Sequence, residues 1–413
     1  MPGNEVFPTW IASQRLPFDN EDIDTTVFDA KFYPYETEDN DQIVAVVAAD
    51  TVVVLRPTQG ADRPFDILCW FQDEQTPQAC YNSLCWTKHP STRNPILCIA
   101  GSEPKHIKIL DIESGRPIRT IAGHGREIND LAVSPVCTNL IASASNDNTI
   151  RLWNIGEEYQ QQPCVALFAG GGHKAPVLAI RFHPNGRWLL SGGIDTAVCL
   201  WAIPSDAELD QGTENSPYRA TKIVHYPHFF STEVHPNYVD CLAFYGDLII
   251  SKAARADDIK DNEIQIWKID GFNSEAEVPE EPPIPVPGNQ TRSSFPHDSR
   301  FRGFQRLLTL DIPNTSRFYH RFGLLHAPGM RPILAMGNEQ SAYSFWDLQR
   351  LDEGIDPKER PKPKKTAGRG KANVLKESLT VLPSSDGARD GARSSTRMRL
   401  PIPHDFEADF LPS

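Results

Sequence analysis

A residue pattern that occurs twice between residues 123 and 201 constrains the fold of this chain more than any other feature. In each copy a Gly-His pair precedes an apolar run, a turn, a second apolar run, an aspartate, and a third apolar run that ends in tryptophan. The two tryptophans are Trp153 and Trp201, so the pattern recurs with a period of roughly 40–50 residues, which is typical of repeat architectures. Each unit of such an architecture buries its apolar face against the next unit, so further copies are expected along the chain.

Weaker copies extend the series to six units. Each has short apolar runs rich in Val, Ile, Leu and aromatic residues, which are typical of β-strands. These copies cover residues 28–55, 81–110, 235–267 and 319–347. We therefore expect an all-β fold, a β-propeller with six recognisable blades over residues 21–351. A propeller closes its ring so that no sheet edge is exposed, and residues 9–15, in an N-terminal arm of residues 1–20, are expected to supply the closing strand.

Two segments outside the repeats have the composition of disordered chain. Residues 271–303 are acidic and proline-rich and are expected to form an insertion between the fifth and sixth blades. Residues 352–413 are rich in Pro, Gly, Ser, Lys and Arg and are expected to form a basic, low-complexity linker or tail. A basic run lies within this tail at residues 358–371. This run either contacts nucleic acid weakly or acts as a nuclear import signal, or it is a solvated linker with no further role.

The composition narrows the class of protein. A net charge of −13 over 413 residues argues against duplex DNA as the main ligand of the folded part and suits basic partners such as histone tails. No apolar run is long enough to span a bilayer and the N-terminus lacks the pattern of a signal peptide, so no membrane contact is expected. The eight cysteines lie mostly in apolar runs without CxxC pairs, so we expect reduced core residues and neither a metal nor a cofactor.

The two strong copies resemble the WD40 family in both spacing and residue type. In that family a histidine, a serine, an aspartate and a tryptophan form a hydrogen-bonded network inside each blade. The resemblance assigns these structural roles to His124, Ser143, Asp147 and Trp153 in one copy, and to His173, Ser191, Asp195 and Trp201 in the other. The same side-chain types could form the triad of a hydrolase, but a set that repeats with the blade is better explained as structure. We therefore expect a binding protein and not an enzyme.

Four of the six units have aromatic residues at the start of their first strand. In a propeller these strand starts lie on the face where ligands bind. The aromatic residues are Phe28, Tyr81, Tyr238 and the pair Phe318 and Tyr319. Any one of these rings could serve only to cap the core. Several rings at one rim favour a methylated ammonium group, because each well-placed ring attracts a cation by roughly 0.5–2 kcal/mol. The sequence therefore predicts a cage for trimethyl-lysine.

A closer resemblance, to the EED / extra sex combs family of WD40 proteins, runs from about residue 20 to residue 350. It rests on residues 235–252, which read HPNYVDCLAFYGDLIISK, and on shorter matches at residues 27–32, 123–129 and 151–155. Members of that family are nuclear, non-catalytic subunits of Polycomb repressive complex 2. They read trimethyl-lysine on the histone H3 tail and stimulate the SET-domain histone methyltransferase subunit allosterically.

This resemblance implies roles for individual residues. The cage would consist of the aromatic residues Phe28, Tyr81, Phe318 and Tyr319, with Phe318 where the family usually has tryptophan. Asn129 would hold the main chain of the tail. Tyr238 and Ala254 would border a small pocket for an alanine of the tail, with Ala254 in place of a larger cysteine. The family has seven blades, so we expect the last blade to be missing at the C-terminal end.

Two other functions stay open at this point. A generic WD40 interaction scaffold, without a methyl-lysine pocket, would share the fold and the repeats but recruit other machinery. A hydrolase built on one of the His/Ser/Asp sets would need His124 or His173 beside a pocket, whereas a structural network would bury both.

Overall fold

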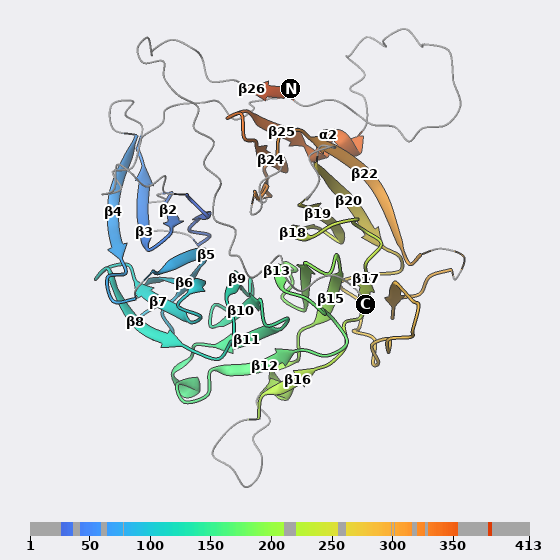
Figure 1. Ribbon diagram of the computed structural model, residues 1–413, viewed down its shortest axis with the longest axis horizontal. Coiled ribbons are helices and arrows are strands. Elements are labelled where there is room, and N and C mark those ends of the chain that lie inside the picture. The colour runs from blue at the N-terminus through green and yellow to red at the C-terminus, as the bar shows by residue number, and fades with distance from the viewer. Residues whose placement is uncertain are drawn as a thin grey trace. The chain divides into compact units, whose positions relative to one another are not determined.

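The computed structural model describes residues 26–35, 42–58, 64–76, 78–209, 220–254, 262–298, 300, 302–315, 320–326, 329–353 and 379–381. Within these residues nearly all regular structure is β-strand, arranged in six sheets (Figure 1). The sheets stand side by side in chain order around a common axis, with one strand of each sheet facing that axis. The all-β propeller with six blades that the repeats predict is therefore confirmed.

Blades 1 and 2 are four-stranded antiparallel sheets. Blade 1, from the axis outward, contains β1 (Asp29–Phe32), β2 (Val44–Ala48), β3 (Thr51–Pro57) and β4 (Phe65–Gln72). Blade 2 contains β5 (Cys80–Lys88), β6 (Pro95–Glu103), β7 (Ile107–Asp111) and β8 (Arg116–Ile121).

Blades 3 and 4 correspond to the two strong sequence copies. Blade 3 contains β9 (Ile128–Val133), β10 (Leu140–Ser145), β11 (Ile150–Asn154) and β12 (Cys164–Phe168), with the short 3-10 helix η1 (Glu157–Tyr159) before β12. Blade 4 contains β13 (Val177–Phe182), β14 (Trp188–Gly193), β15 (Val198–Ala202) and β17 (Phe229–Ser231), with α1 (Asp206–Leu209) after β15.

Blades 5 and 6 complete the described part of the ring. Blade 5 contains β18 (Val239–Tyr245), β19 (Leu248–Ala253), β20 (Asn262–Ile269) and β22 (Phe304–Ile312). Blade 6 contains β23 (Gly323–Leu325), β24 (Ile333–Gly337), β25 (Tyr343–Asp347) and β26 (Leu379–Val381), with α2 (Leu348–Glu353) after β25. Neither described α-helix is long and apolar enough to cross a membrane.

Two blades gain a fifth strand from a segment of the following blade. β16 (Lys222–Val224) lies in the chain between β15 and β17 of blade 4, but it pairs in parallel with β12 of blade 3. β21 (Thr291–Ser293) lies between β20 and β22 of blade 5, but it pairs with β17 of blade 4. We call β16 and β21 the borrowed strands. Together they join blades 3, 4 and 5 along their outer edges.

Apolar side chains alternate along the strands and pack between neighbouring blades, as the period-2 geometry of a strand requires. In β2, Ala45 and Val47 face a core shared with Leu84 and Leu97 of blade 2. Equivalent cores join each further pair of blades up to blades 5 and 6. Among the described residues no such core contains side chains of both blade 6 and blade 1. The ring is thus held by apolar packing at five junctions, and its first and last described blades share no apolar core.

The flanking segments differ in part from the prediction. The expected closing strand at residues 9–15 lies outside the described residues. The acidic segment that begins at residue 271 lies inside blade 5, between β20 and β22, and not between blades 5 and 6. Two of its residues are held by the core, since Phe272 and Phe295 pack against Trp188 at centroid distances of 5.4 and 5.6 Å. The composition of the segment gave no sign that Phe272 and Phe295 pack against the core.

One strand falls within the range expected to form the tail. β26 pairs with β25 through the register Phe345↔Leu379, and it supplies the outer strand of blade 6. The rest of residues 354–413, including the basic run at 358–371, lies outside the described residues.

Candidate functional site

The His-Ser-Asp-Trp sets form hydrogen-bonded chains inside their blades. In blade 3 the Trp153 indole donates to Ser143 Oγ at 2.7 Å, and His124 Nε2 lies 2.7 Å from the same oxygen. His124 Nδ1 lies 2.8 Å from Asp147 Oδ2. The Asp147 carboxylate can only accept, so His124 Nδ1 donates to it, and in the neutral imidazole Nε2 then accepts the proton of the Ser143 hydroxyl. Burial lowers the pKa of His124, against the opposing effect of Asp147.

Blade 4 repeats this chain. Trp201 donates to Ser191 Oγ at 2.9 Å, His173 Nε2 lies 2.8 Å from that oxygen, and His173 Nδ1 lies 3.0 Å from Asp195 Oδ1. The two sets predicted from the repeats are thus brought together as expected. His124 and His173 are buried within the blades, and Ser143 and Ser191 are fully buried. None of these residues lines either of the two cavities described below.

A third chain, in blade 5, was not predicted. Trp267 donates to Ser251 Oγ at 2.8 Å, and His235 Nε2 lies 2.6 Å from the same atom. All three side chains are buried. The signal was present in the sequence, since His235, Ser251 and Trp267 occupy the same places as in the strong copies. The longer spacing to the tryptophan obscured it.

Two of the four predicted cage residues, Phe28 and Tyr81, belong to the same apolar core. Phe28 directly precedes β1, is half-buried, and packs against the apolar core that contains Tyr81 of β5. The Tyr81 backbone N–H donates to the Ala49 carbonyl at 2.8 Å, which ties β5 to the turn between β2 and β3. Phe318 and Tyr319 lie outside the described residues.

The hydroxyl group at the end of the Tyr81 side chain is held by a hydrogen bond. It donates to Asp73, whose Oδ2 also forms an ion pair of 2.5 Å with Lys108 Nζ. The Tyr81 side chain is fully buried, and both burial and the Asp73 carboxylate raise its pKa well above the usual range. Tyr81 therefore keeps its proton, and its ring is held in one orientation by the Asp73–Lys108 pair.

Asn129, in β9, is also buried and internally bonded. Its Nδ2 donates to Asn146 Oδ1 at 2.7 Å and to the Val177 carbonyl of blade 4 at 2.8 Å. In this state the amide bridges two blades, so a ligand that bonds to Asn129 must compete with these partners.

Tyr238 and Ala254, which were predicted to border a pocket for an alanine of the tail, lie next to each other, but only Ala254 lines the cavity at this place. The Ala254 N–H donates to the Tyr238 carbonyl at 2.8 Å, and Tyr238 directly precedes β18. Tyr238 is 36 % exposed, whereas Ala254 is buried. Ala254 lines a cavity of about 30 Å³ together with Pro236, Asn237 and Ala253. The cavity is small and therefore suits a small side chain.

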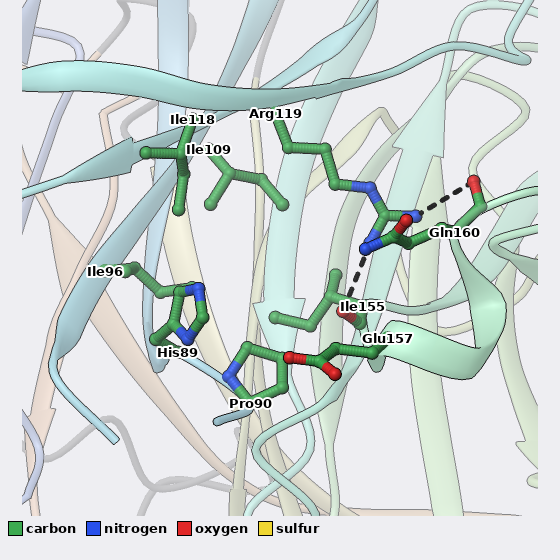
Figure 2. Close-up of a pocket in the computed structure, with 9 residues that line it drawn as sticks. All are labelled: His89, Pro90, Ile96, Ile109, Ile118, Arg119, Ile155, Glu157 and Gln160. Atoms are coloured by element: carbon green, nitrogen blue, oxygen red, sulfur yellow. Dashed lines mark hydrogen bonds between the residues drawn. The ribbon is translucent and has the colours of Figure 1, made fainter. Parts of the chain in front are cut away.

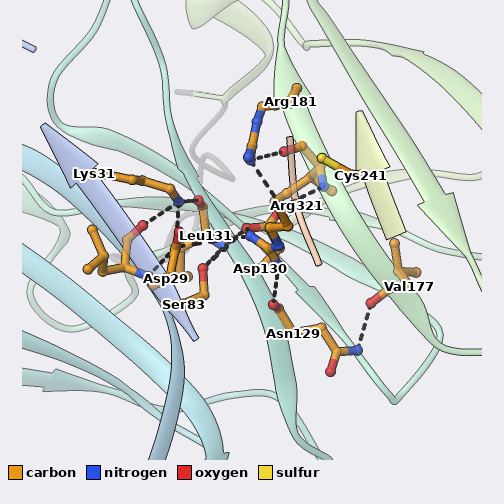
Figure 3. Close-up of polar contacts among 12 residues, drawn as sticks. Asp29, Lys31, Ser83, Asn129, Asp130, Leu131, Val177, Arg181, Cys241 and Arg321 are labelled. Atoms are coloured by element: carbon orange, nitrogen blue, oxygen red, sulfur yellow. Dashed lines mark hydrogen bonds and ion pairs between the residues drawn. The ribbon is translucent and has the colours of Figure 1, made fainter. Parts of the chain in front are cut away.

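A network of charged residues connects the innermost strands of blades 1, 3 and 4 with Arg321 (Figure 3), and sequence reasoning missed it. Asp130 of β9 is fully buried, and it accepts from Arg321 at 2.9 Å and from Arg181 of β13 at 3.1 Å. Burial alone would raise the pKa of Asp130, but Arg321 and Arg181 hold it well below the usual range. Lys31 of β1 reaches the Leu131 carbonyl at 3.3 Å. The signal available in the sequence was the presence of single charges inside otherwise apolar strands.

A second cavity, of about 160 Å³, lies between blades 2 and 3 (Figure 2). His89 and Pro90 of its lining follow the end of β5, and Ile155, Glu157 and Gln160 follow the end of β11. By contrast, Phe28, Tyr81 and Asn129 stand at the starts of innermost strands. Because neighbouring strands are antiparallel, the cavity opens on the opposite end of the ring. Four isoleucines line it, Ile96, Ile109, Ile118 and Ile155. Arg119 borders it and donates to the Ile155 carbonyl at 3.1 Å.

Within the described part of the chain, no group of three or more His, Cys, Asp or Glu side chains is placed to hold a metal ion.

Known proteins resemble this chain at the level of both sequence and structure. The family described as WD domain, G-beta repeat matches residues 115–154 and 163–202, which belong mainly to blades 3 and 4. Over 337 residues the chain is 40 % identical to Polycomb protein EED of Chaetomium thermophilum, covering 79 % of this chain and 57 % of that protein. It is 27 % identical over 347 residues to Polycomb protein esc of Drosophila melanogaster, covering 80 % of this chain and 72 % of that protein.

Solved structures that resemble this chain also belong to Polycomb complexes. A chain of the Chaetomium thermophilum Polycomb Repressive Complex 2 bound to GSK126 is 39 % identical with a TM-score of 0.72, and the match covers 81 % of this chain and 72 % of that one. A chain from the same complex with trimethyl-lysine histone H3 is 39 % identical with a TM-score of 0.71, covering 79 % of this chain and 67 % of that one. The chain spans 57 % of the length of the Chaetomium EED protein, so it matches a part of that relative and not its whole.

Proposed function

Because the chain belongs to the EED / extra sex combs family of WD40 proteins, we propose that it is a non-catalytic reader of trimethyl-lysine on the histone H3 tail. In this proposal it acts in the nucleus as a scaffold subunit of a Polycomb-type complex. It stimulates the SET-domain histone methyltransferase subunit when the tail is bound.

One arrangement carries the proposal. Phe28 and Tyr81 stand at the starts of neighbouring innermost strands and share one apolar core. Asn129 and Tyr238 occupy the matching positions of blades 3 and 5, at the same end of the ring. This placement supports a rim in which aromatic faces meet the methylammonium and polar groups meet the main chain of the tail.

The burial of the Tyr81 ring has a consequence for how the tail would bind. A fully buried ring offers no face to a ligand, so the tail must uncover one face of Tyr81 as it binds. The Asp73–Lys108 pair holds the phenol during this step, so only the neighbouring surface has to move. Phe318 and Tyr319 are proposed to complete the cage, and Ala254 to border the pocket for a small side chain of the tail.

Fluorescence anisotropy with histone H3 peptides tests the reader function. Wild-type protein should bind a trimethylated peptide at least several-fold more tightly than the unmethylated one. Phe28→Ala and Tyr81→Ala should abolish that preference while the circular dichroism spectrum stays that of a folded β protein. Equal binding of both peptides by the wild type would favour the alternative, a generic WD40 scaffold without a methyl-lysine pocket.

We further propose that the isoleucine-lined cavity of Figure 2 receives an apolar side chain of the methyltransferase subunit. Ile118 at its edge is 47 % exposed, so a side chain of a partner can reach it. Ile118→Asp should weaken co-purification of the catalytic subunit at least tenfold. Ile284→Asp serves as the matched control, since Ile284 is 69 % exposed and does not line the cavity. Equal loss in both variants would contradict this assignment.

The basic run at residues 358–371 is proposed to make at most weak contacts with nucleic acid. Charge-neutral replacement of its lysines and arginines should reduce non-specific DNA binding and leave peptide binding unchanged.

A further inference from the structure

We propose that Arg321 is a positioning residue of the methyl-lysine site: its guanidinium joins the strand starts that carry Asn129 and Phe28. This inference rests on the reader function proposed above and assigns a role to a residue outside the proposed aromatic cage.

Arg321 contacts residues of blade 3 and of blade 1 (Figure 3). Its Nη1 donates to Asp130 Oδ1 at 2.9 Å, and its Nη2 donates to the Asn129 carbonyl at 3.1 Å. Nη1 also lies 4.0 Å from Asp29 Oδ2. One side chain of blade 6 thus contacts blade 3, which lies across the ring, and blade 1, with which blade 6 shares no described apolar core.

Each contacted residue belongs to, or directly adjoins, a proposed ligand-binding residue. The Asn129 carbonyl belongs to the residue that would hold the main chain of the tail. Asp29 follows Phe28 in the chain, and Arg321 itself stands two residues after Tyr319. Since a shift of a binding group by about 1 Å is enough to lose much of its interaction energy, a fixed link between these positions determines how well the rim fits the tail.

The burial of this link makes it rigid. The Arg321 side chain is 10 % exposed and that of Asp130 is fully buried, so the charges meet with little screening by water. The planar guanidinium bonds to two acceptors at once from a fixed fork. A lysine at this position would keep the charge but could not hold both Asp130 and the Asn129 carbonyl in the same geometry.

Arg181 provides a matched comparison. It donates to the other oxygen of the same carboxylate, Asp130 Oδ2, at 3.1 Å. It makes no described contact with Asn129 or Asp29. If the only role of these arginines were to neutralise Asp130, replacing either one would have the same effect on peptide binding.

The test compares Arg321→Lys with Arg181→Lys in the full chain, titrated with trimethylated and unmethylated H3 peptides. We expect Arg321→Lys to raise the Kd for the trimethylated peptide at least fivefold, and Arg181→Lys to change it less than twofold. Near-ultraviolet circular dichroism and thermal melting establish that each variant is folded. In a double variant with Asn129→Ala, the loss should be smaller than the sum of the two single losses, because part of the effect of Arg321→Lys acts through Asn129.

Three outcomes decide the matter. Wild-type binding by a folded Arg321→Lys protein would overturn the positioning role, and so would equal losses in the two lysine variants. Absence of selective binding by the wild type would instead overturn the reader function itself. Should Arg321→Lys fail to fold, Asp130→Asn weakens the same link from its other side, and undiminished binding by that variant would also overturn the inference.

Discussion

Lys252 and Asp240 form an ion pair in which both side chains are fully buried, with Lys252 Nζ 2.8 Å from Asp240 Oδ1 and 2.9 Å from Oδ2. They lie on the neighbouring strands β18 and β19, in the inner half of blade 5. Burial raises the pKa of Asp240, which the lysine only partly offsets. Such a pair contributes little net stability when intact, but either charge alone would be strongly unfavourable in this position.

We therefore expect Lys252→Met to lower the free energy of unfolding by about 3–5 kcal/mol at neutral pH, because it leaves the Asp240 carboxylate without its cation. Urea unfolding followed by tryptophan fluorescence measures this loss. The double variant Lys252→Met with Asp240→Leu should recover much of it. A double variant less stable than Lys252→Met alone would contradict the explanation.

Ser191 links His173 and Trp201, so its hydroxyl is required by two buried partners. Ser191→Ala should lower the free energy of unfolding by about 1–3 kcal/mol, because the indole N–H and the imidazole nitrogen lose their common partner. Ser134 is the matched control, being equally buried but with no hydrogen-bond partner for its Oγ among the described residues. Ser134→Ala should be neutral or slightly stabilising. Similar thermal denaturation midpoints for the two variants would argue against the network.

The hydroxyl of Tyr81 bonds to a charged group in a buried place. Tyr81→Phe removes this bond and leaves Asp73 with Lys108, so we expect a loss of about 1.5–3 kcal/mol in the free energy of unfolding. The exposed Tyr343 provides the control, and Tyr343→Phe should change stability by less than about 0.5 kcal/mol. In peptide titrations Tyr81→Phe should retain the preference for trimethyl-lysine, since the ring remains. Loss of that preference would show that the hydroxyl itself takes part in binding.

His235 makes the stability of blade 5 depend on pH. Burial, together with the nearby charges of Arg306 and Lys252, lowers its pKa to about 3 in the folded protein. The unfolded chain takes up the proton near its ordinary pKa of about 6.5, so stability from the neutral imidazole is present above that pH and is lost as the pH falls toward 3. Between these values the loss is about 1.4 kcal/mol per pH unit.

Urea denaturation at several pH values between 4 and 7 measures this slope. His235→Asn should reduce it by about 1.4 kcal/mol per pH unit, because the variant has no imidazole to protonate at this position. An unchanged slope in a folded variant would assign the pH dependence to other groups.

The sequence predicted the blades well where local signals agree. Gly-His, Asp and Trp recur at matching positions in blades 3 and 4, and the structure joins these residues by hydrogen bonds, as expected. The chain of His235, Ser251 and Trp267 was overlooked because a longer segment separates the last two. The borrowed strands were also missed, since a strand of three residues carries no visible period and its partner lies in another blade.

For the candidate site, the sequence predicted which residues lie at the strand starts but not their burial or their contacts. Strand starts can be read from the repeat, which placed Phe28, Tyr81 and Tyr238 at one end of the ring. The sequence could not reveal that Tyr81 is fully covered, nor that Asn129 bridges two blades. Arg321 of blade 6 contacts Asp130 of blade 3. These residues lie far apart in the sequence, and no local sequence pattern predicts such a contact.

The borrowed strands have a consequence for how the protein comes apart. To detach blade 3 from its neighbour, the hydrogen bonds between β12 and β16 must break, and β16 is covalently part of blade 4. Blade 4 is fastened to blade 5 in the same way through β17 and β21. A force that separates these blades would load both strand pairs, so the three blades should exchange their amide hydrogens as one slow cooperative block. Blades 1, 2 and 6 have no borrowed strand among the described residues, so we expect their amide hydrogens to exchange faster than those of blades 3 to 5.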